Sequence, residues 1–253
     1  MIDQKHHPYR SLLFVPATRP ERFKKAMTSG ADTVCVDLED AVPLEQKDIA
    51  RTQALPFFVR DDLSKTKKAL RINCTRSVQG IQDILMLAKM EILPDIILVP
   101  KVESPDEISG LNTIFMQNHD NIRFMALIET PVGLEQAFYI AKVKNVDCLV
   151  FGSADYSAEL GSQMNWDALL YPRSRIVQAA AAVGINAIDG AWMDLNDPDG
   201  LLKESERVAA LGFTGRAALH PKQVAIINQA FMPLPEALLE AKKIIAAYKE
   251  NKG

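Results

Sequence analysis

Ionisable and polar side chains follow almost every apolar, strand-like run of this sequence. They are Asp37, Glu39, Asp40, Arg71, Asn73, Lys101, Glu103, Glu129, Ser153, Asp155, Asp189 and His220. One such residue usually caps a helix or faces solvent, but so many repetitions are harder to explain in that way. Because the carboxyl ends of parallel strands meet at one edge of a sheet, we expect these groups to gather in one place. The acids outnumber the cations there, so a divalent cation is the expected neutraliser.

The chemical type of these ligands favours magnesium over zinc. Carboxylate oxygens are hard ligands, and Mg²⁺ typically takes one or two of them while it keeps waters and leaves room for substrate oxygens. Neither the four histidines nor the three cysteines show the clustered spacing of a zinc site. We therefore expect Mg²⁺ as the cofactor.

The elements that must position these groups are eight strand-like runs, several of them continuously apolar as in parallel strands covered on both faces. They are residues 11–15, 33–38, 69–73, 96–100, 123–129, 148–152, 186–188 and 214–219. Amphipathic segments alternate with them, including 172–183, which ends at Gly184, and 198–211, which lies between the caps Asp197 and Gly212. Eight β–α units predict an α/β fold, a single (β/α)8 TIM barrel, with a doubly wound open sheet as the alternative.

The composition excludes several classes of protein. Apolar residues make up 48% of the 253 residues and charged residues 24%, which excludes disorder over most of the chain. The net charge of −3, without a long basic run, argues against nucleic acid as a partner. The longest charge-free apolar stretch, 176–188, is too short to cross a bilayer, and the first residues do not resemble a signal peptide.

The organisation and the cysteines lead to two further expectations. No linker, low-complexity tract or charge block divides the chain, so we expect one domain over residues 1–253. The cysteines are Cys35, Cys74 and Cys148, which are odd in number and far apart. We interpret them as reduced thiols of a cytoplasmic protein.

Phosphate and Schiff-base chemistry find little support. No GxGxxG or P-loop pattern is present, and the glycines Gly212 and Gly215 precede the last strand, at the opposite mouth of a barrel. Lys101 comes closest to a Schiff-base lysine, but Glu103 follows it, and we interpret Lys101 as a salt-bridged side chain.

Nine short motifs occur along the chain. They are 10–16 (RSLLFVP), 37–42 (DLEDAV), 71–73 (RIN), 100–103 (PKVE), 128–134 (IETPVGL), 151–155 (FGSAD), 173–175 (RSR), 187–190 (AIDG) and 220–224 (HPKQV). Each motif alone is a weak signal. In this order and at this spacing, the chain resembles the citrate lyase beta chain, malyl-CoA lyase and citramalyl-CoA lyase family of the HpcH/HpaI aldolase–citrate lyase superfamily, from about Arg10 to Ile245.

The resemblance implies a TIM barrel, often a homotrimer, that cleaves a 3-hydroxy-3-carboxyacyl thioester to an acetyl thioester and a 2-oxo acid. The candidate substrates that it implies are citramalyl-CoA, malyl-CoA and a citryl thioester. It implies that Glu129 and Asp155 bind Mg²⁺, with Glu129 also at the substrate, and that Arg71 contacts the substrate. The acids of residues 37–40 would surround the metal and its waters.

The remaining roles follow from the retro-Claisen chemistry. A base must take the hydroxyl proton, and Asp37 and Glu39 are the candidates within the chain. The segment from Phe14 to Arg19, with Lys24 and Lys25, would hold the anionic arm of coenzyme A. For the two lysines, a solvated helix face is an equal alternative.

The chain also departs from the family pattern. Arg216 occupies a position where relatives often have Lys, and Ser77 and Gln79 replace the usual Thr and Trp. The sequence ends at Gly253, so we expect a short C-terminal helix in place of the long C-terminal lid of larger relatives. The general acid, which that lid supplies from a neighbouring subunit, is therefore left unassigned.

Three functions remain in competition. The first is the Mg²⁺-dependent lyase acting on a coenzyme A thioester or an acyl-carrier thioester. The second is an aldolase acting on free hydroxy-oxo-acids, without any thioester. The third is a metal-binding subunit, similar to the citrate lyase beta chain, that is active only with partners.

Overall fold

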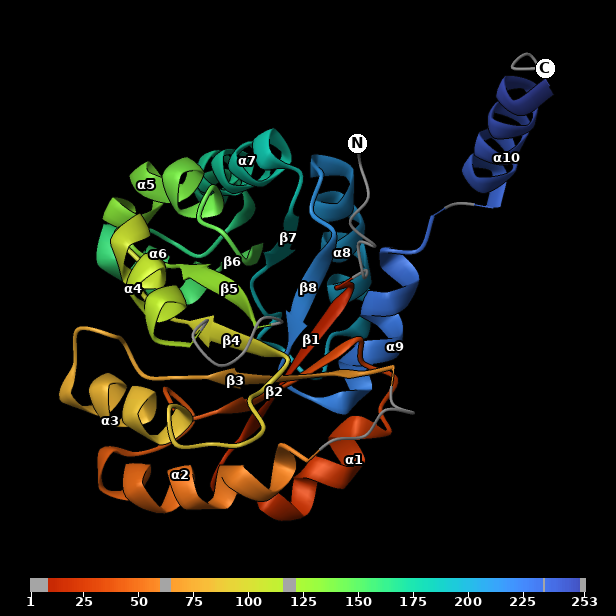
Figure 1. Ribbon diagram of the computed structural model, residues 1–253. Helices are drawn as coiled ribbons and strands as arrows, with labels where there is room; N and C mark the ends of the chain where they lie inside the picture. The colour runs from red at the N-terminus through yellow and green to blue at the C-terminus, as the bar shows by residue number, and fades with distance from the viewer. Residues whose placement is uncertain (1–8, 60–64, 116–121, 234, 251–253) are drawn as a thin grey trace.

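The computed structural model describes residues 9–59, 65–115, 122–233 and 235–250, and its strands form a closed parallel barrel (Figure 1). The strands are β1 (Ser11–Pro16), β2 (Thr33–Asp37), β3 (Lys67–Arg71), β4 (Ile96–Val99), β5 (Arg123–Ile128), β6 (Val146–Phe151), β7 (Asn186–Asp189) and β8 (Gly215–Ala218). Each strand pairs with the next along the chain, and β1 closes the ring against β8. The closed ring confirms the predicted TIM barrel and excludes the open, doubly wound sheet.

Strand residues alternate between two hydrophobic clusters. In β1, Leu12 packs inside the barrel and Leu13 packs against the helices; in β4, Leu98 and Val99 divide in the same way. This alternation follows from the two-residue period of a strand. Cys35 and Cys148 are free, buried thiols of the inner cluster, and Cys74 is a free, half-buried thiol.

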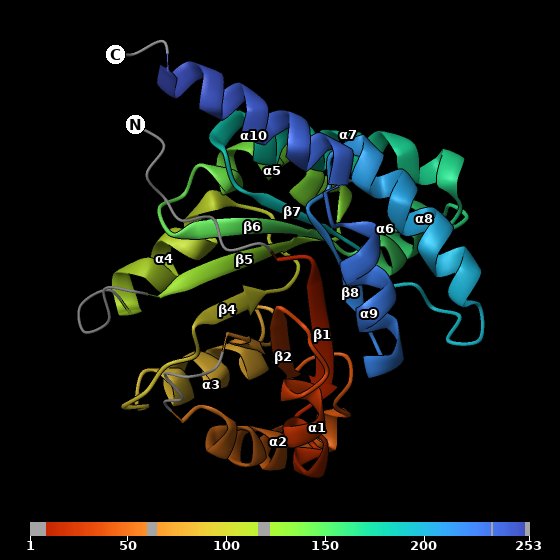
Figure 2. The same ribbon diagram turned by 90° about the vertical axis from the view of Figure 1, so that its right-hand side faces the viewer.

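Helices surround the barrel in the order of the βα units, and one further helix, α10, follows the last unit (Figures 1 and 2). They are α1 (Phe23–Met27), α2 (Lys47–Ala54), α3 (Val78–Leu87), α4 (Pro105–Phe115), α5 (Pro131–Ala141), α6 (Ser153–Leu160), α7 (Trp166–Val183), α8 (Pro198–Leu211), α9 (Pro221–Ala230) and α10 (Pro235–Glu250), with 3-10 turns at Pro20–Arg22, Leu44–Gln46 and Leu55–Phe57. The predicted caps are confirmed at Asp197, which accepts from the Gly200 N–H at 2.8 Å, and at the left-handed glycines Gly184 and Gly212.

Two helix predictions were wrong around residues 153–172. The helix expected to begin at Pro172 begins at Trp166, because the Asn165 side chain caps it by accepting from the Ala168 N–H at 3.0 Å. Pro172 lies inside this helix and is buried, so packing offsets the loss of one backbone hydrogen bond. The short helix α6 was not predicted at all; its eight residues follow β6 directly and end at Gly161, which is left-handed.

The predicted short C-terminal helix is α10, which stands away from the barrel in Figure 1. It exposes the apolar side chains of Leu238, Leu239, Ile244, Ile245 and Tyr248. Within the described residues, no helix is both long and apolar enough to cross a bilayer. The expectation of one domain over residues 1–253 stays a prediction.

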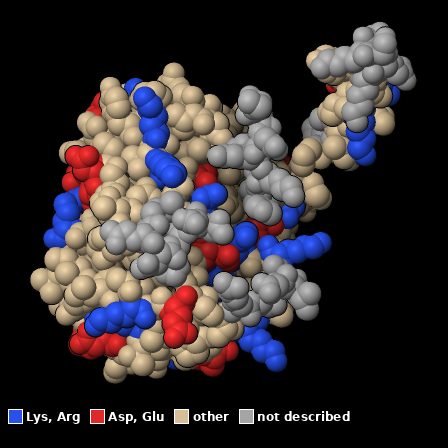
Figure 3. Space-filling view, in the orientation of Figure 1, with Lys and Arg blue, Asp and Glu red and all other residues tan. Residues whose placement is uncertain are grey.

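Figure 3 shows the face of the molecule seen in Figure 1, with basic and acidic side chains interspersed among uncharged ones. No broad area of a single sign is visible among the described residues on that face. This distribution agrees with the net charge of −3. The absence of a nucleic-acid partner stays a prediction.

Candidate active site

Asp37 and Arg71 are the last residues of β2 and β3, and the register of the two strands pairs them directly. Both are buried. Arg71 donates from Nε to Oδ1 and from Nη2 to Oδ2 of Asp37, each at 2.6 Å. Asp37 also accepts from the backbone N–H groups of Glu39, at 2.8 Å, and Ala41, at 3.1 Å. This bidentate pair fixes the plane of the guanidinium. With the two backbone N–H groups, each Asp37 oxygen accepts two hydrogen bonds.

Three further groups surround the Arg71 guanidinium. Nη1 lies 3.0 Å from Oε2 of Glu39 and 3.1 Å from Oδ2 of Asp40, and Cζ lies 4.8 Å from the centroid of the Phe14 ring. Burial and the neighbouring Asp40 raise the pKa of Glu39 to about 7, although the charge of Arg71 acts in the opposite direction. Glu39 therefore holds its proton more readily near neutral pH than an ordinary carboxyl group does.

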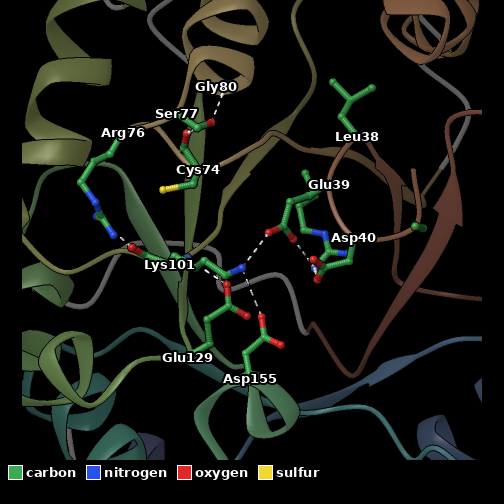
Figure 4. Close-up of polar contacts among 12 residues, drawn as sticks. Leu38, Glu39, Asp40, Cys74, Arg76, Ser77, Gly80, Lys101, Glu129 and Asp155 are labelled. Atoms are coloured by element: carbon green, nitrogen blue, oxygen red, sulfur yellow. Dashed lines mark hydrogen bonds and ion pairs between the residues drawn. The ribbon is translucent and has the colours of Figure 1, made fainter. Parts of the chain in front are cut away.

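Lys101 follows β4 and lies between acids from different loops (Figure 4). Its Nζ is 3.4 Å from Oε1 of Glu39 and 3.5 Å from Oδ2 of Asp155. Its backbone N–H donates to Oε1 of Glu129 at 2.9 Å. The structure thus confirms the salt-bridged interpretation of Lys101, and this residue connects three of the acids predicted at the mouth.

Glu129 and Asp155 reach the site from two neighbouring βα units. Glu129 directly follows β5 and is buried, whereas Asp155 lies in the first turn of α6 and is more exposed. Burial, and then the charges of Glu39 and Asp155, raise the pKa of Glu129 to about 8. The pKa of Glu129 is therefore raised first by burial and then by the neighbouring acids, and Arg71 and Lys101 offset only part of this rise.

The residues of this mouth fit a magnesium ion. Within the described part of the chain, no group of three or more His, Cys, Asp or Glu side chains could hold a metal ion. The mouth offers two carboxylates instead, Glu129 and Asp155, and this is the usual protein contribution to a magnesium site. Oε2 of Glu39 is buried beside Nη1 of Arg71, and the Lys101 ammonium already occupies a cation position among the acids.

A cavity of about 340 Å³ opens at the ends of β1 and β8. Its lining residues are Phe14, Val15, Pro16, Arg22, Lys25, Ala26, Leu219, His220 and Pro221. Phe14 also stacks on Arg71, so the cavity adjoins the acidic mouth. Its volume is within the range of ligand pockets, and Arg22 and Lys25 give its rim a positive charge.

The structure places part of the predicted basic segment at this cavity and part of it elsewhere. Arg19 and Lys24 are exposed and do not line the cavity, whereas Lys25 does. The sequence analysis missed Arg22. The signal was available, because residues 22 and 25 are three apart and share one face of a helical turn.

Asp189 does not face the mouth as predicted. It is buried and pairs with Arg173, at 3.1 Å to each of its oxygens, and with Arg216, at 2.7 Å. Arg216 is fully buried and also bonds the Gly190 carbonyl at 2.9 Å. Because Ile188 belongs to the inner cluster, the next residue must point outward to the helices, where Glu204 completes the ion-pair network.

His220 lines the cavity but is not placed among the acids of the mouth. It caps α9 through a reciprocal pair of hydrogen bonds with Gln223, and its Nδ1 accepts from the Lys222 N–H at 3.1 Å. We therefore interpret His220 as a helix cap beside the ligand cavity.

Comparison with known proteins places the chain in a family. The family profile described as HpcH/HpaI aldolase/citrate lyase matches residues 10–221. The chain belongs to this family. The family assignment confirms the resemblance inferred from the motifs. Together with the relatives described next, it identifies the protein as an enzyme of the lyase type.

Two curated relatives of this HpcH/HpaI family member are named as lyases. The mitochondrial citramalyl-CoA lyase of Rattus norvegicus is 33% identical over 268 aligned residues, which cover 99% of this chain and 79% of the relative. The citrate lyase subunit beta of Leuconostoc mesenteroides subsp. cremoris is 31% identical, over 96% of this chain and 83% of the relative.

Two solved structures are similar to this chain over more than nine tenths of its length. RipC from Yersinia pestis has a TM-score of 0.81 and 35% identity, covering 92% of this chain and 100% of that one. The CitE protein of Mycobacterium tuberculosis, in complex with magnesium, acetoacetate and coenzyme A, has a TM-score of 0.80 and 30% identity, covering 97% and 89%.

Proposed function

We propose that this protein is a magnesium-dependent carbon–carbon lyase that cleaves a 3-hydroxy-3-carboxyacyl thioester of coenzyme A to acetyl-CoA and a 2-oxo acid. The observation that supports this most strongly is the convergence of Glu129, Asp155 and Arg71 on one mouth beside a cavity with a cationic rim. Among citramalyl-CoA, malyl-CoA and a citryl thioester, we favour citramalyl-CoA, because the rat citramalyl-CoA lyase aligns with 99% of the chain.

In this proposal, Glu129 and Asp155 hold the magnesium ion. When bound, Mg²⁺ polarises the substrate hydroxyl and carboxylate and stabilises negative charge on the 2-oxo acid that forms. Support for the choice of metal comes from the donor set of this mouth and from the magnesium complex of the CitE relative.

Arg71 is proposed to stabilise the negative charge that develops on the substrate carboxylate or on the thioester enolate oxygen. Asp37 holds the guanidinium plane through the bidentate pair, and the Phe14 ring covers one face. A preorganised guanidinium needs no reorganisation during the reaction, which is why such donors are effective in catalysis.

Proton transfer is assigned to Glu39 in preference to Asp37. Each Asp37 oxygen already accepts two hydrogen bonds, whereas Oε2 of Glu39 is held less fully, by an ion pair with Nη1 of Arg71 at 3.0 Å. A carboxyl group with a pKa of about 7 can take a proton and return it at neutral pH. Glu39 would take the hydroxyl proton as the carbon–carbon bond breaks, and the electron pair of that bond would pass to the thioester as its enolate. Water would then protonate the enolate carbon.

The coenzyme A arm is proposed to enter through the cavity beside Phe14. Arg22 and Lys25 on its rim suit the phosphates of the arm, and the apolar lining suits its pantetheine part. Arg19, which does not line the cavity, is not included in this assignment.

The substrate is tested by incubating purified protein and Mg²⁺ with each of citramalyl-CoA, malyl-CoA and citryl-CoA and measuring free 2-oxo acid. We expect EDTA-sensitive release of pyruvate from citramalyl-CoA. Release of a 2-oxo acid from a free hydroxy-oxo-acid, with none from the three thioesters, would favour the aldolase. Activity that appears only after partner subunits are added would favour the subunit function, for which the Leuconostoc relative is a precedent in name.

We also propose that the protein is a homotrimer, as the family resemblance implies. The exposed apolar side chains of α10 support association, because a helix of this kind gains stability when a neighbour covers its apolar residues. Light scattering coupled to size exclusion measures the mass directly, and a 28.0 kDa species would contradict the proposal. The cytoplasmic location stays a prediction.

A further inference from the structure

Lys101 has a backbone conformation that lysine rarely adopts. Its φ angle is +53°, in the left-handed region, and Asn145 is the only other non-glycine residue of the described chain with a positive φ. Asparagine tolerates this region through its short polar side chain, but lysine has no such compensation. Strained residues of this kind persist where the surroundings hold them firmly, and they cluster at functional sites.

The surroundings of Lys101 hold its backbone from both sides. Its N–H donates to Oε1 of Glu129 at 2.9 Å, and its carbonyl accepts from Nη1 of Arg76 at 3.0 Å. Arg76 is itself paired with Glu103, at 2.9 Å, and with Glu107, at 2.6 Å. The strained turn therefore aims one lysine at a proposed metal ligand through its backbone and at the other acids through its side chain (Figure 4).

The side chain makes two long ion pairs in place of one short one. Nζ lies 3.4 Å from Glu39 and 3.5 Å from Asp155, and Figure 4 shows it between these acids. Each distance exceeds that of a short charge-assisted hydrogen bond, which is about 2.7–2.9 Å. A cation shared in this way is held by the combined charge of the acids and can move without breaking a tight hydrogen bond.

We propose that Lys101 is a positioning residue whose ammonium substitutes for the divalent cation in the metal-free enzyme and leaves Asp155 when Mg²⁺ binds. This inference rests on the proposed function, since it needs the magnesium site on Glu129 and Asp155. Arg71 pairs with Glu39, but without the Lys101 ammonium the acids Glu39, Glu129 and Asp155 would repel one another more strongly. The ammonium keeps these acids together, and it also competes with the metal.

The test is calorimetric titration of MgCl₂ into metal-stripped wild type and three variants, together with unfolding temperatures in EDTA. Lys101→Met removes the charge at similar length and keeps the backbone N–H, and Lys101→Arg keeps the charge. Lys89→Met is the matched control, because Lys89 is exposed just beyond α3, toward the opposite mouth of the barrel.

We expect Lys101→Met to bind Mg²⁺ with a Kd about tenfold lower than wild type, because the metal no longer displaces an ammonium. The same variant should unfold at a lower temperature in EDTA and gain more from added Mg²⁺. Lys101→Arg should return both quantities toward wild type, and Lys89→Met should match wild type throughout.

Equal or weaker Mg²⁺ binding by Lys101→Met would overturn the inference while the wild-type titration still supports the metal site. An unchanged unfolding temperature of Lys101→Met in EDTA would also overturn it. Wild type that binds no Mg²⁺ would contradict the proposed function and the inference together.

Discussion

A Cβ atom at Gly152 would lie 2.5 Å from Oε2 of Glu129 and would also overlap the Glu129 Cβ. Gly152 directly follows β6 and is the N-cap of α6, the helix that contains Asp155. Its φ angle of −89° is open to any residue, so close approach is the reason for glycine here. The backbone that positions one proposed metal ligand thus rests directly against the side chain of the other.

The first prediction concerns this contact. Gly152→Ala should displace the Glu129 carboxylate and weaken Mg²⁺ binding by about tenfold or more, which corresponds to about 1.4 kcal/mol. Calorimetric titration measures the change. The control is Gly110→Ala in α4, where a Cβ would meet nothing within 4 Å and alanine should stabilise the helix slightly. Wild-type affinity in Gly152→Ala would show that Glu129 is not a ligand held in this position.

The second prediction concerns Arg71. Arg71→Lys keeps the charge but loses the two parallel hydrogen bonds to Asp37, and lysine cannot replace that fork. We expect kcat/KM to fall about 100-fold, or about 3 kcal/mol of transition-state stabilisation. Arg123→Lys, at the start of β5 and the opposite mouth, should retain full activity. A loss smaller than about threefold in Arg71→Lys would mean that the fork is structural only.

The third prediction concerns pH. The pKa of Glu129 is raised to about 8 and that of Glu39 to about 7, both above the ordinary 4.5. The folded, metal-free protein therefore keeps protons that the unfolded chain has lost, and its stability should fall as pH rises from about 4.5 toward 8. Over the same range Mg²⁺ binding should tighten, because the ligand must lose its proton.

Titrations with Mg²⁺ in two buffers of different ionisation enthalpy count the protons released at each pH. We expect proton release near pH 6 that disappears above about pH 9, and urea unfolding in EDTA supplies the matching stability profile. An affinity for Mg²⁺ that does not change between these pH values would contradict the raised pKa of Glu129.

The fourth prediction separates stability from chemistry. Arg216 is fully buried and pairs with Asp189 and Glu204. Arg216→Met therefore leaves less positive charge beside these two carboxylates. We expect a loss of about 3 kcal/mol in the free energy of unfolding, measured in urea, because breaking a buried ion pair from one side is costly. Activity per folded molecule should stay close to wild type. A large loss of activity in fully folded protein would place this network in the catalytic machinery.

Much of the site could be predicted, because the position of each residue relative to its strand can be read from the sequence around it. Parallel strands bring their carboxyl ends together, so the polar residues after the strands predicted that Arg71, Glu129 and Asp155 lie at one mouth. The barrel itself followed from eight alternating units. Asp189 was the error, although the two-residue strand period and the apolar Ile188 would have placed it outside.

Other features depended on contacts that the sequence does not display. The need for glycine at position 152 arises from Glu129, which is distant in sequence. Helix α6 is short and weakly amphipathic, and the true start of α7 depended on the Asn165 cap more than on Pro172. Arg22 differs from these features, because its three-residue spacing from Lys25 was a signal in the sequence that was not used.

The central claim is a magnesium-dependent lyase whose metal is held by Glu129 and Asp155. The most direct test is the rate of pyruvate release from citramalyl-CoA by wild type, Glu129→Gln and Asp155→Asn, with Mg²⁺ and with EDTA. We expect release by wild type that EDTA abolishes and added Mg²⁺ restores. Neither variant should show Mg²⁺-dependent release while it still unfolds cooperatively. Full activity of either variant, or wild-type activity that survives EDTA, would contradict it.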